Sequence, residues 1–309
     1  MSIKIISKIL LEIFCILSGV MMIVTAYYVS IDKKHPTRIG TTAFWALLGI
    51  VFMGGTYMPN ELTGGLILIM GILTALKQVN IGKLLEPTEE FKENQSKKIG
   101  SKIFVPSVIL AVAAFVVAQY TKLGGEVAIG ISALVAIIFT IIITKSPLKN
   151  VIVDGDRMMQ QVGPSNILPQ LLAALGTVFT TAGVGQVISQ GISTVMPKGN
   201  ILLGVIVYCI SMAIFTIIMG NAFAAFAVIT AGVGIPFVFS QGANPAIASA
   251  LALTAGYCGT LMTPMAANFN VVPAALLETK SKNRIIITQL PVAILLLIIH
   301  IILMYKLAF

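Results

Sequence analysis

Between residues 158 and 277 the sequence carries a single charged side chain, Lys198. Over the whole chain 57% of residues are hydrophobic and 10% are charged, and the mean hydropathy is +0.99. This is more apolar than an ordinary soluble domain needs in order to build a core, whereas a helix that spans a bilayer needs about 20 mainly apolar residues. The chain contains many such runs, so we predict an all-α, polytopic protein of the cytoplasmic membrane.

The first part of the chain, residues 1–144, is expected to hold uninterrupted transmembrane helices that act as a scaffold and contact a partner. Their apolar runs cover residues 6–31, 39–57, 62–76, 103–120 and 126–144. Two charged stretches lie outside these runs. Residues 77–102 form either a solvated loop or a short helix that starts near residue 87. Residues 145–163 are polar, and a turn is expected at residues 154–157.

The second part, residues 145–309, is expected to contain interrupted helices. Gly, Thr, Asn and Pro break its apolar runs at residues 180–185, 220–221, 230–234 and 256–264. The pentapeptide TAGVG occurs twice within these breaks, through chance or local duplication, and both copies predict flexible or broken helix. The chain therefore has about eight to ten transmembrane segments, depending on which apolar segments cross fully and which are re-entrant hairpins.

The interruptions are the leading candidates for a binding site. Because lipid offers no hydrogen bonds, irregular backbone at bilayer depth must be buried in protein or line a cavity. Asn221 is placed to cap a helix that begins at Ala222, and Thr263 is placed to cap a helix that begins at Pro264. The candidate substrate-binding residues are Gly220, Asn221, Thr260, Thr263, Asn268, Asn270, Thr180 and Thr181.

An anion bound in this uncharged region would have to be held by helix N-termini, hydroxyls and amides, or by a partner subunit. Broken helices in many secondary transporters present helix N-termini to anionic substrates and free carbonyls to cations. The alternative is that the Thr and Asn side chains only satisfy backbone groups that the interruptions set free.

The distribution of Lys and Arg predicts the orientation of the chain. Fifteen of the 20 lie in four loops, which cover residues 30–40, 77–102, 144–163 and 278–284. Positive charge favours the cytoplasmic side, so we expect both termini outside. This loop placement also accounts for the basic composition without a nucleic-acid partner.

Other classes of site find little support in the sequence. The three cysteines, Cys15, Cys209 and Cys258, lie in apolar runs without CxxC spacing and are interpreted as packing residues. His35 and His300 are isolated and do not have the spacing of a metal site. No hydrolase, P-loop or zinc-protease motif is present, so we expect neither enzymatic activity nor a cofactor.

Three segments carry a resemblance to known transporters. They read LLAALGTVFTTAGVGQVISQGI, IIMGNAFAAFAVITAGVG and ALALTAGYCGTLMTPMAANFN. In order and spacing they resemble the second half of gluconate-type permeases of the ion transporter superfamily. The whole chain is similar to a bacterial family of uncharacterised membrane proteins regarded as one subunit of a 5-oxoproline (pyroglutamate) transporter.

The resemblance implies a carboxylate importer in which each half contributes one hairpin and one broken helix. The residues that match the superfamily's binding motifs are Gly220, Asn221, Thr260, Thr263 and Asn268. The coupling ion is H⁺ or Na⁺, and the candidate position for Na⁺ lies near Gly220 and Gly259. Since this chain has only one set of interruptions, the resemblance implies a second, shorter membrane subunit, with a homodimer as the other option.

These observations predict a subunit of a secondary transporter that imports a small carboxylate, 5-oxoproline in particular, by cation symport. The alternative is a membrane scaffold or assembly subunit that transports nothing. In that case the interruptions would pack dry against one another, and no polar cavity would lie at Thr263.

Overall fold

A computed structural model describes residues 2–82, 89–163, 167–195, 199–277, 279–281 and 283–309. These residues form helices and turns and contain no strand. Among them, seven helices are long and apolar enough to cross a membrane, or eight if α8 (Leu168–Thr181) and α9 (Val184–Val195) form one bent span. The predicted all-α, polytopic membrane class is confirmed.

The chain divides into two compact units, Met1–Gly163 and Pro164–Phe309. The sequence places the boundary after residue 144, where the part of the chain with interrupted helices is expected to begin. The division by packing instead places α7 (Leu148–Val162) in the first unit, because α7 lies against α1 (Ile3–Ile31).

In the first unit, α1 packs along α2 (Arg38–Gly54), and α3 (Asn60–Ala75) follows after the 3-10 turn Gly55–Tyr57. The side chains buried on α1 and α2 include Met22, Ala26, Val29, Phe44, Trp45 and Leu48. Rings of Phe44 and Trp45 meet edge to face with their centroids 5.4 Å apart. This pair of helices carries six of the eleven buried apolar side chains that the structure describes in the unit.

The charged stretch after α3 is expected to be either a solvated loop or a short helix. It contains a helix, α4 (Glu89–Ile99). A 3-10 turn, Gly100–Phe104, leads into α5 (Val105–Tyr120), which packs on α6 (Gly125–Thr144). No side chain of α5 is fully buried. A helix that remains apolar while it stays exposed is typical of a surface that faces lipid.

The turn predicted at residues 154–157 is wrong, because these residues lie inside α7. Asp154 and Arg157 form an ion pair one helical turn apart, with Nε 3.1 Å from Oδ1. Gln160 Nε2 donates to both carboxylate oxygens of Asp156 at 3.1 Å. Packing against α1 and i to i+3 or i+4 polar pairs stabilise a helix where charge density alone suggests a turn.

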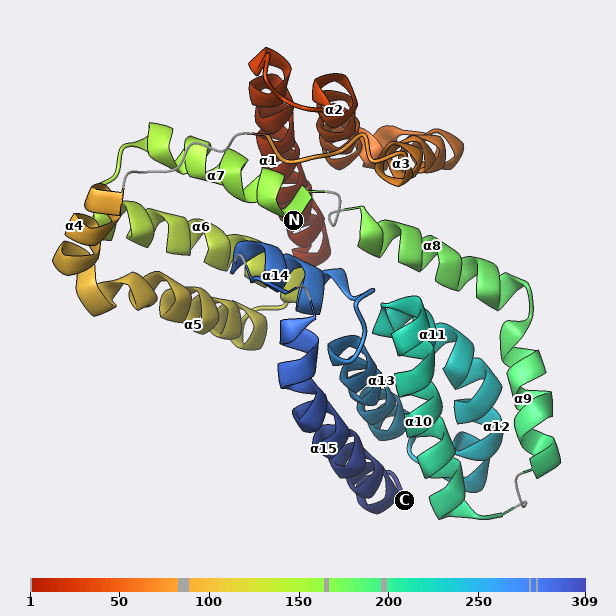
Figure 1. Ribbon diagram of the computed structural model, residues 1–309. Helices are drawn as coiled ribbons and strands as arrows, with labels where there is room; N and C mark the ends of the chain where they lie inside the picture. The colour runs from red at the N-terminus through yellow and green to blue at the C-terminus, as the bar shows by residue number, and fades with distance from the viewer. Residues whose placement is uncertain (1, 83–88, 164–166, 196–198, 278, 282) are drawn as a thin grey trace. The chain divides into compact units, whose positions relative to one another are not determined.

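The core of the second unit is formed by α10 (Ile201–Met219), α13 (Pro245–Leu261) and α15 (Arg284–Leu307), with α11 (Ala222–Ile229) packed beside them (Figure 1). Its fully buried side chains include Val205, Tyr208, Cys209, Met212, Ala225, Ala252, Ala255 and Met304. Small residues dominate α13, so the helices approach closely.

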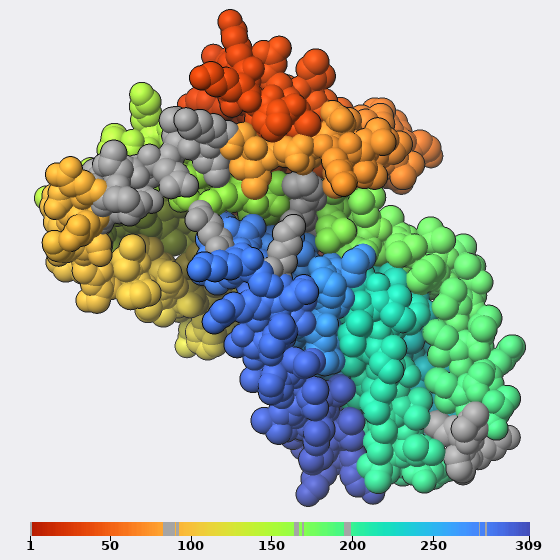
Figure 2. Space-filling view, viewed as in Figure 1, coloured from red at the N-terminus to blue at the C-terminus, as the bar shows by residue number. Residues whose placement is uncertain are grey.

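The break predicted at residues 180–185 is confirmed, because α8 and α9 meet at an angle of 62°. The corner is formed by Ala182 and Gly183, and Gly183 adopts a left-handed φ of +74°. In Figure 2 the green atoms of α8 and α9 lie against the blue-green atoms of α10 and α11. The bent segment formed by α8 and α9 contacts the core through α8, which packs on α11.

The second copy of TAGVG is not a break. Thr230–Gly234 forms a π-helical turn that joins α11 to the short α12 (Ile235–Phe237) within one apolar span. Its Gly232 lies against Gly185 of the first copy, so that a Cβ on Gly232 would stand 2.9 Å from the Gly185 carbonyl carbon. The two glycine-containing copies therefore form a contact between α9 and the π turn.

Candidate functional site

The interruption between α10 and α11 is built by a glycine and an asparagine. Gly220 ends α10 with a left-handed φ of +69°, a conformation that favours glycine. Asn221 Oδ1 then accepts from the backbone N–H groups of Phe223 at 2.9 Å and Ala224 at 3.3 Å. The predicted cap at Asn221 is confirmed, and it satisfies two of the N–H groups that every helix start leaves unpaired.

The interruption after α13 begins later than predicted. The helix continues through Gly256 and Gly259 to Leu261. Gly256 serves close packing, because a Cβ there would lie 2.9 Å from Met212 Cε and 3.1 Å from Ala222 Cβ. Glycine lowers helix propensity, but packing against neighbouring helices overrides that preference in this position.

The cap predicted at Thr263 is wrong, because no helix begins at Pro264. The next helical segment is a π turn, Ala267–Val271, which continues into α14 (Val272–Leu276). Thr263 Oγ1 instead donates to the carbonyl of Ile217 at 2.8 Å and accepts from Met265 N at 3.2 Å. Ile217 lies in the last turn of α10, where carbonyls lack partners within the helix, so the hydroxyl satisfies one of them.

Asn270 holds the interruption together from inside. The residue is 2% exposed, and its Nδ2 donates to the carbonyls of Thr260 and Thr263, both at 2.8 Å. Its Oδ1 is buried and has no hydrogen-bond partner in the part of the chain that the structure describes. Asn270 thus pairs carbonyl groups freed by the interruption and leaves one buried oxygen unpaired.

The two interruptions lie against each other. A Cβ on Gly220 would stand 2.7 Å from both Cβ and O of Met265, so the backbones meet at van der Waals contact. The hydrogen bond from Thr263 to Ile217 joins the same two segments. Segments far apart in the sequence are therefore brought together at one place in the second unit.

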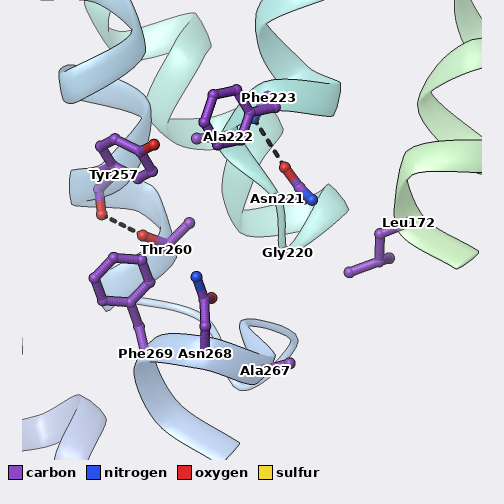
Figure 3. A pocket seen from close by; sticks show the side chains of 10 residues that line it. All are labelled: Leu172, Gly220, Asn221, Ala222, Phe223, Tyr257, Thr260, Ala267, Asn268 and Phe269. Carbon is purple, nitrogen blue, oxygen red and sulfur yellow. Dashed lines mark hydrogen bonds between the residues drawn. The ribbon is translucent and has the colours of Figure 1, made fainter. Parts of the chain in front are cut away.

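A pocket of about 340 Å³ opens at this meeting point (Figure 3). The described residues that line it are Leu172, Gly220, Asn221, Ala222, Phe223, Tyr257, Thr260, Ala267, Asn268 and Phe269. They come from α8, from the start of α11, from the last turns of α13 and from the π turn that follows it.

Four of the predicted residues line this pocket: Gly220, Asn221, Thr260 and Asn268. Thr263 and Asn270 are buried beside it and do not line it. Thr180 and Thr181 stand apart from it, and their hydroxyls donate to the carbonyls of Gly176 and Thr177 within α8.

The described lining of the pocket is mostly apolar, and its few polar side chains are uncharged. Asn221 and Asn268 supply amides, and Thr260 Oγ1 already donates to the Tyr257 carbonyl at 2.6 Å, which leaves it as an acceptor. The N-terminus of α11 borders the same space and carries a partial positive charge of about half an elementary charge. Such a lining can hold a small anion or a neutral polar group.

No group of three or more His, Cys, Asp or Glu side chains among the described residues is arranged to hold a metal ion. The buried oxygens that lack a hydrogen-bond partner in the described structure include Thr216 Oγ1 and Asn270 Oδ1. Thr216 faces Gly259, whose Cβ would stand 3.0 Å from Thr216 Cβ. A monovalent cation could use such neutral oxygens as ligands.

The aromatic side chains of the pocket, Phe223, Tyr257 and Phe269, are absent from the residues predicted from the sequence. Phe223 follows the Asn221 cap by two residues, and Phe269 lies between two candidate asparagines. Aromatic residues close to Asn221, Asn268 and Asn270 are the available signal. It is hard to separate from ordinary core and lipid-facing residues in so apolar a chain.

Comparison with known proteins places the chain in a family without assigning it an activity. No curated protein and no solved structure matches it. The family described as "Protein of unknown function (DUF979)" matches residues 12–309, nearly the entire chain, and the protein belongs to that family.

Proposed function

We propose that this protein is a subunit of a secondary transporter that imports a small carboxylate, with 5-oxoproline as the preferred substrate, together with a cation. The observation that carries the proposal is the pocket at the meeting point of two interrupted helices, where Gly220, Asn221, Thr260 and Asn268 come together. Irregular backbone at membrane depth lines binding sites in many secondary transporters.

The charge of the pocket supports a substrate with one negative charge. None of the described lining residues is charged, so the attraction comes from the N-terminus of α11 and from neutral donors. About half an elementary charge at a helix end suits one carboxylate better than two. A second carboxylate would be buried without a compensating charge.

The size and the lining of the pocket support 5-oxoproline within that class. A volume of about 340 Å³ lies at the small end of the range for ligand sites, which begins at about 300 Å³. Amide side chains such as Asn268 offer both a donor and an acceptor, which match the ring amide of 5-oxoproline. The resemblance to the 5-oxoproline transporter subunits favours the same substrate.

The coupling cation is H⁺ or Na⁺, and the structural features favour Na⁺ near Gly220 and Gly259. The unpaired buried oxygens of Thr216 and Asn270 are neutral and cannot carry a proton at physiological pH. In transporters with broken helices, unwound carbonyls and helix C-termini commonly coordinate Na⁺.

The partner in the proposal is a second membrane subunit, with a homodimer as the other option. The described residues contain one set of meeting interruptions, in the second unit, whereas the resembled permeases use two. We propose that the lipid membrane and this partner cover the exposed apolar helices, and that both termini lie outside. The proposal includes no enzymatic step.

Uptake by cells tests this function. Cells that express the chain together with the membrane protein encoded beside it should accumulate labelled 5-oxoproline above cells with either subunit alone. Replacement of external Na⁺ by choline, at constant pH, should abolish the uptake if Na⁺ is the coupling ion. No accumulation by the complete complex in either medium would count against transport.

A membrane scaffold is the second candidate, and one observation favours it. Thr263 is buried and bonded to Ile217, and it does not line the pocket, as expected where interruptions pack dry. The scaffold predicts an assembled complex whose stability depends on this chain and whose 5-oxoproline uptake does not change when Asn268 is replaced by Leu.

A further inference from the structure

Three aromatic rings form one side of the pocket, with Tyr257 in the centre (Figure 3). The Tyr257 ring meets Phe223 edge to face, with centroids 6.0 Å apart and an angle of 82° between the planes. It meets Phe269 at 5.9 Å and 47°. These are favourable geometries for aromatic pairs, and the three residues come from α11, α13 and the π turn Ala267–Val271.

The cluster is not part of the buried core of the unit. Phe223 is 63% exposed, and Tyr257 and Phe269 are both partly exposed. The Tyr257 hydroxyl has no hydrogen-bond partner among the described residues, whereas Tyr208 in the core donates to or accepts from Thr230 at 2.8 Å. The exposed ring surface and the open hydroxyl of Tyr257 therefore remain available to a ligand.

We propose that Tyr257, supported by Phe223 and Phe269, is the specificity-determining residue of the pocket and selects carboxylates with a flat ring over open-chain carboxylates of equal charge. The inference rests on the proposed transport of a small carboxylate and adds the shape that the site selects.

The selection follows from how each ligand meets the aromatic surface. A flat ring covers an aromatic face with little loss of conformational freedom, because its own torsions are already fixed. An open chain must be ordered on binding, and each immobilised torsion weakens its affinity. Hydroxyls along a sugar acid would also be pressed against aromatic carbon without partners, which is unfavourable.

The discriminating ligand pair is 5-oxoproline and N-acetylalanine. Both carry one carboxylate and one amide, so they differ mainly in whether the ring is closed. Gluconate, with one carboxylate and an open polyhydroxylated chain, is the third ligand. Inhibition of labelled 5-oxoproline uptake by each unlabelled compound gives the preference for the ring.

The test compares variants in the complete complex. We expect the wild type to prefer 5-oxoproline over N-acetylalanine, Tyr257→Phe to keep that preference, and Tyr257→Leu to lose it by about five- to tenfold. Phe269→Leu should lose part of it. Phe179→Leu is the matched control, because Phe179 forms an aromatic pair with Phe215 at 6.0 Å and does not line the pocket.

The outcomes separate the inference from the function on which it rests. A wild type that takes up carboxylates without preferring the ring, or an unchanged preference in both Tyr257→Leu and Phe269→Leu, overturns the inference and leaves transport standing. If the complex with Tyr257→Leu does not assemble, the ring preference of the Phe269→Leu complex decides whether the inference stands. A wild-type complex that takes up no carboxylate overturns the proposed function and the inference together.

Discussion

At the scale of single residues, the polar side chains of the interruptions fall into two groups. Thr263 and Asn270 are buried, and their donors are used on backbone carbonyls. Asn221, Thr260 and Asn268 border the pocket and keep atoms that can meet a ligand. Substitution of Thr263 should therefore act on stability, and substitutions in the second group should act on binding.

Gly220→Ala should destabilise the second unit more than Gly242→Ala. Both glycines have a left-handed φ, +69° and +97°, which costs another residue about 1–2 kcal/mol. At Gly220 the added Cβ would also stand 2.7 Å from the Met265 backbone, whereas the space around Gly242 is open.

Thermal unfolding with a thiol-reactive dye measures this difference, because Cys209 and Cys258 are buried in the second unit. A Cys15→Ser background removes the third thiol. Equal melting temperatures for the two alanine variants would contradict the close approach of the two interruptions.

At the scale of helices, the sequence predicts most elements and misplaces the details that packing decides. The start of α11 follows from Asn221, which is predicted as its cap, and the structure shows Asn200 and Asn244 capping α10 and α13 in the same way. Gly256 cannot be interpreted from the sequence alone, because a packing glycine and a helix-breaking glycine look the same until the neighbouring helix is known.

Thr263 and the aromatic cluster are two features of the site that likewise cannot be predicted from local sequence patterns. The Thr-Pro pair has the form of a cap. The Thr263 hydroxyl instead donates to a carbonyl of α10 that lies 46 residues earlier in the chain. Tyr257 and Phe269 become a pocket wall only when α13 and the π turn fold back on each other. Long-range partners decide both outcomes, and local patterns do not contain them.

Gly232→Ala should loosen the contact between α9 and the π turn Thr230–Gly234. The added Cβ would lie within 3.0 Å of Gly185 backbone atoms, and overpacking of this kind costs about 1–3 kcal/mol. Gly191→Ala is the control on α9, because nothing lies within 4 Å of its added Cβ. A lowered melting temperature is expected for Gly232→Ala alone, and a tolerated Gly232→Ala would contradict the contact.

Asp156 on α7 should make the first unit more stable in acid. Burial raises the pKa of its carboxyl above the usual range, although hydrogen bonds from Gln160 oppose the shift. The folded state therefore holds the proton more tightly than the unfolded state, so this contribution is present below the usual carboxyl pKa of about 4 and is lost as the pH rises through the raised value.

The comparison is wild type against Asp156→Asn, which keeps an acceptor for Gln160. Fluorescence of Trp45, the single tryptophan and buried in α2 of the same unit, reports unfolding there. From about pH 4 to pH 7 the melting temperature of the wild type should fall relative to the variant. Parallel pH profiles would show that Asp156 does not titrate with folding.

At the scale of the whole molecule, we propose a membrane protein that binds an anion with neutral groups. In this proposal the Lys and Arg residues of the loops set the orientation, and the pocket holds the anion with helix ends and amides. The concentration of 15 basic residues in four loops predicts that both termini lie outside the cytoplasm.

Reporter fusions after Phe309 measure the orientation. Alkaline phosphatase fused there should be active and green fluorescent protein should be dark, because the first folds outside the cytoplasm and the second inside it. Fusions truncated in the loop at residues 278–284 should show the reverse pattern. A fluorescent C-terminal fusion to the full chain would contradict the proposed topology.

The central claim is that the pocket beside Asn221 binds the carboxylate, and uptake by proteoliposomes tests it most directly. Vesicles with the chain and its partner are given an inward Na⁺ gradient and labelled 5-oxoproline. Asn221→Ala and Asn244→Ala each remove an N-cap and should each cost about 1 kcal/mol of stability, but only Asn221 lines the pocket. The account predicts uptake near the wild-type rate for Asn244→Ala and at least about tenfold slower uptake for Asn221→Ala, a loss of about 1.4 kcal/mol. Equal uptake by the two variants would contradict it.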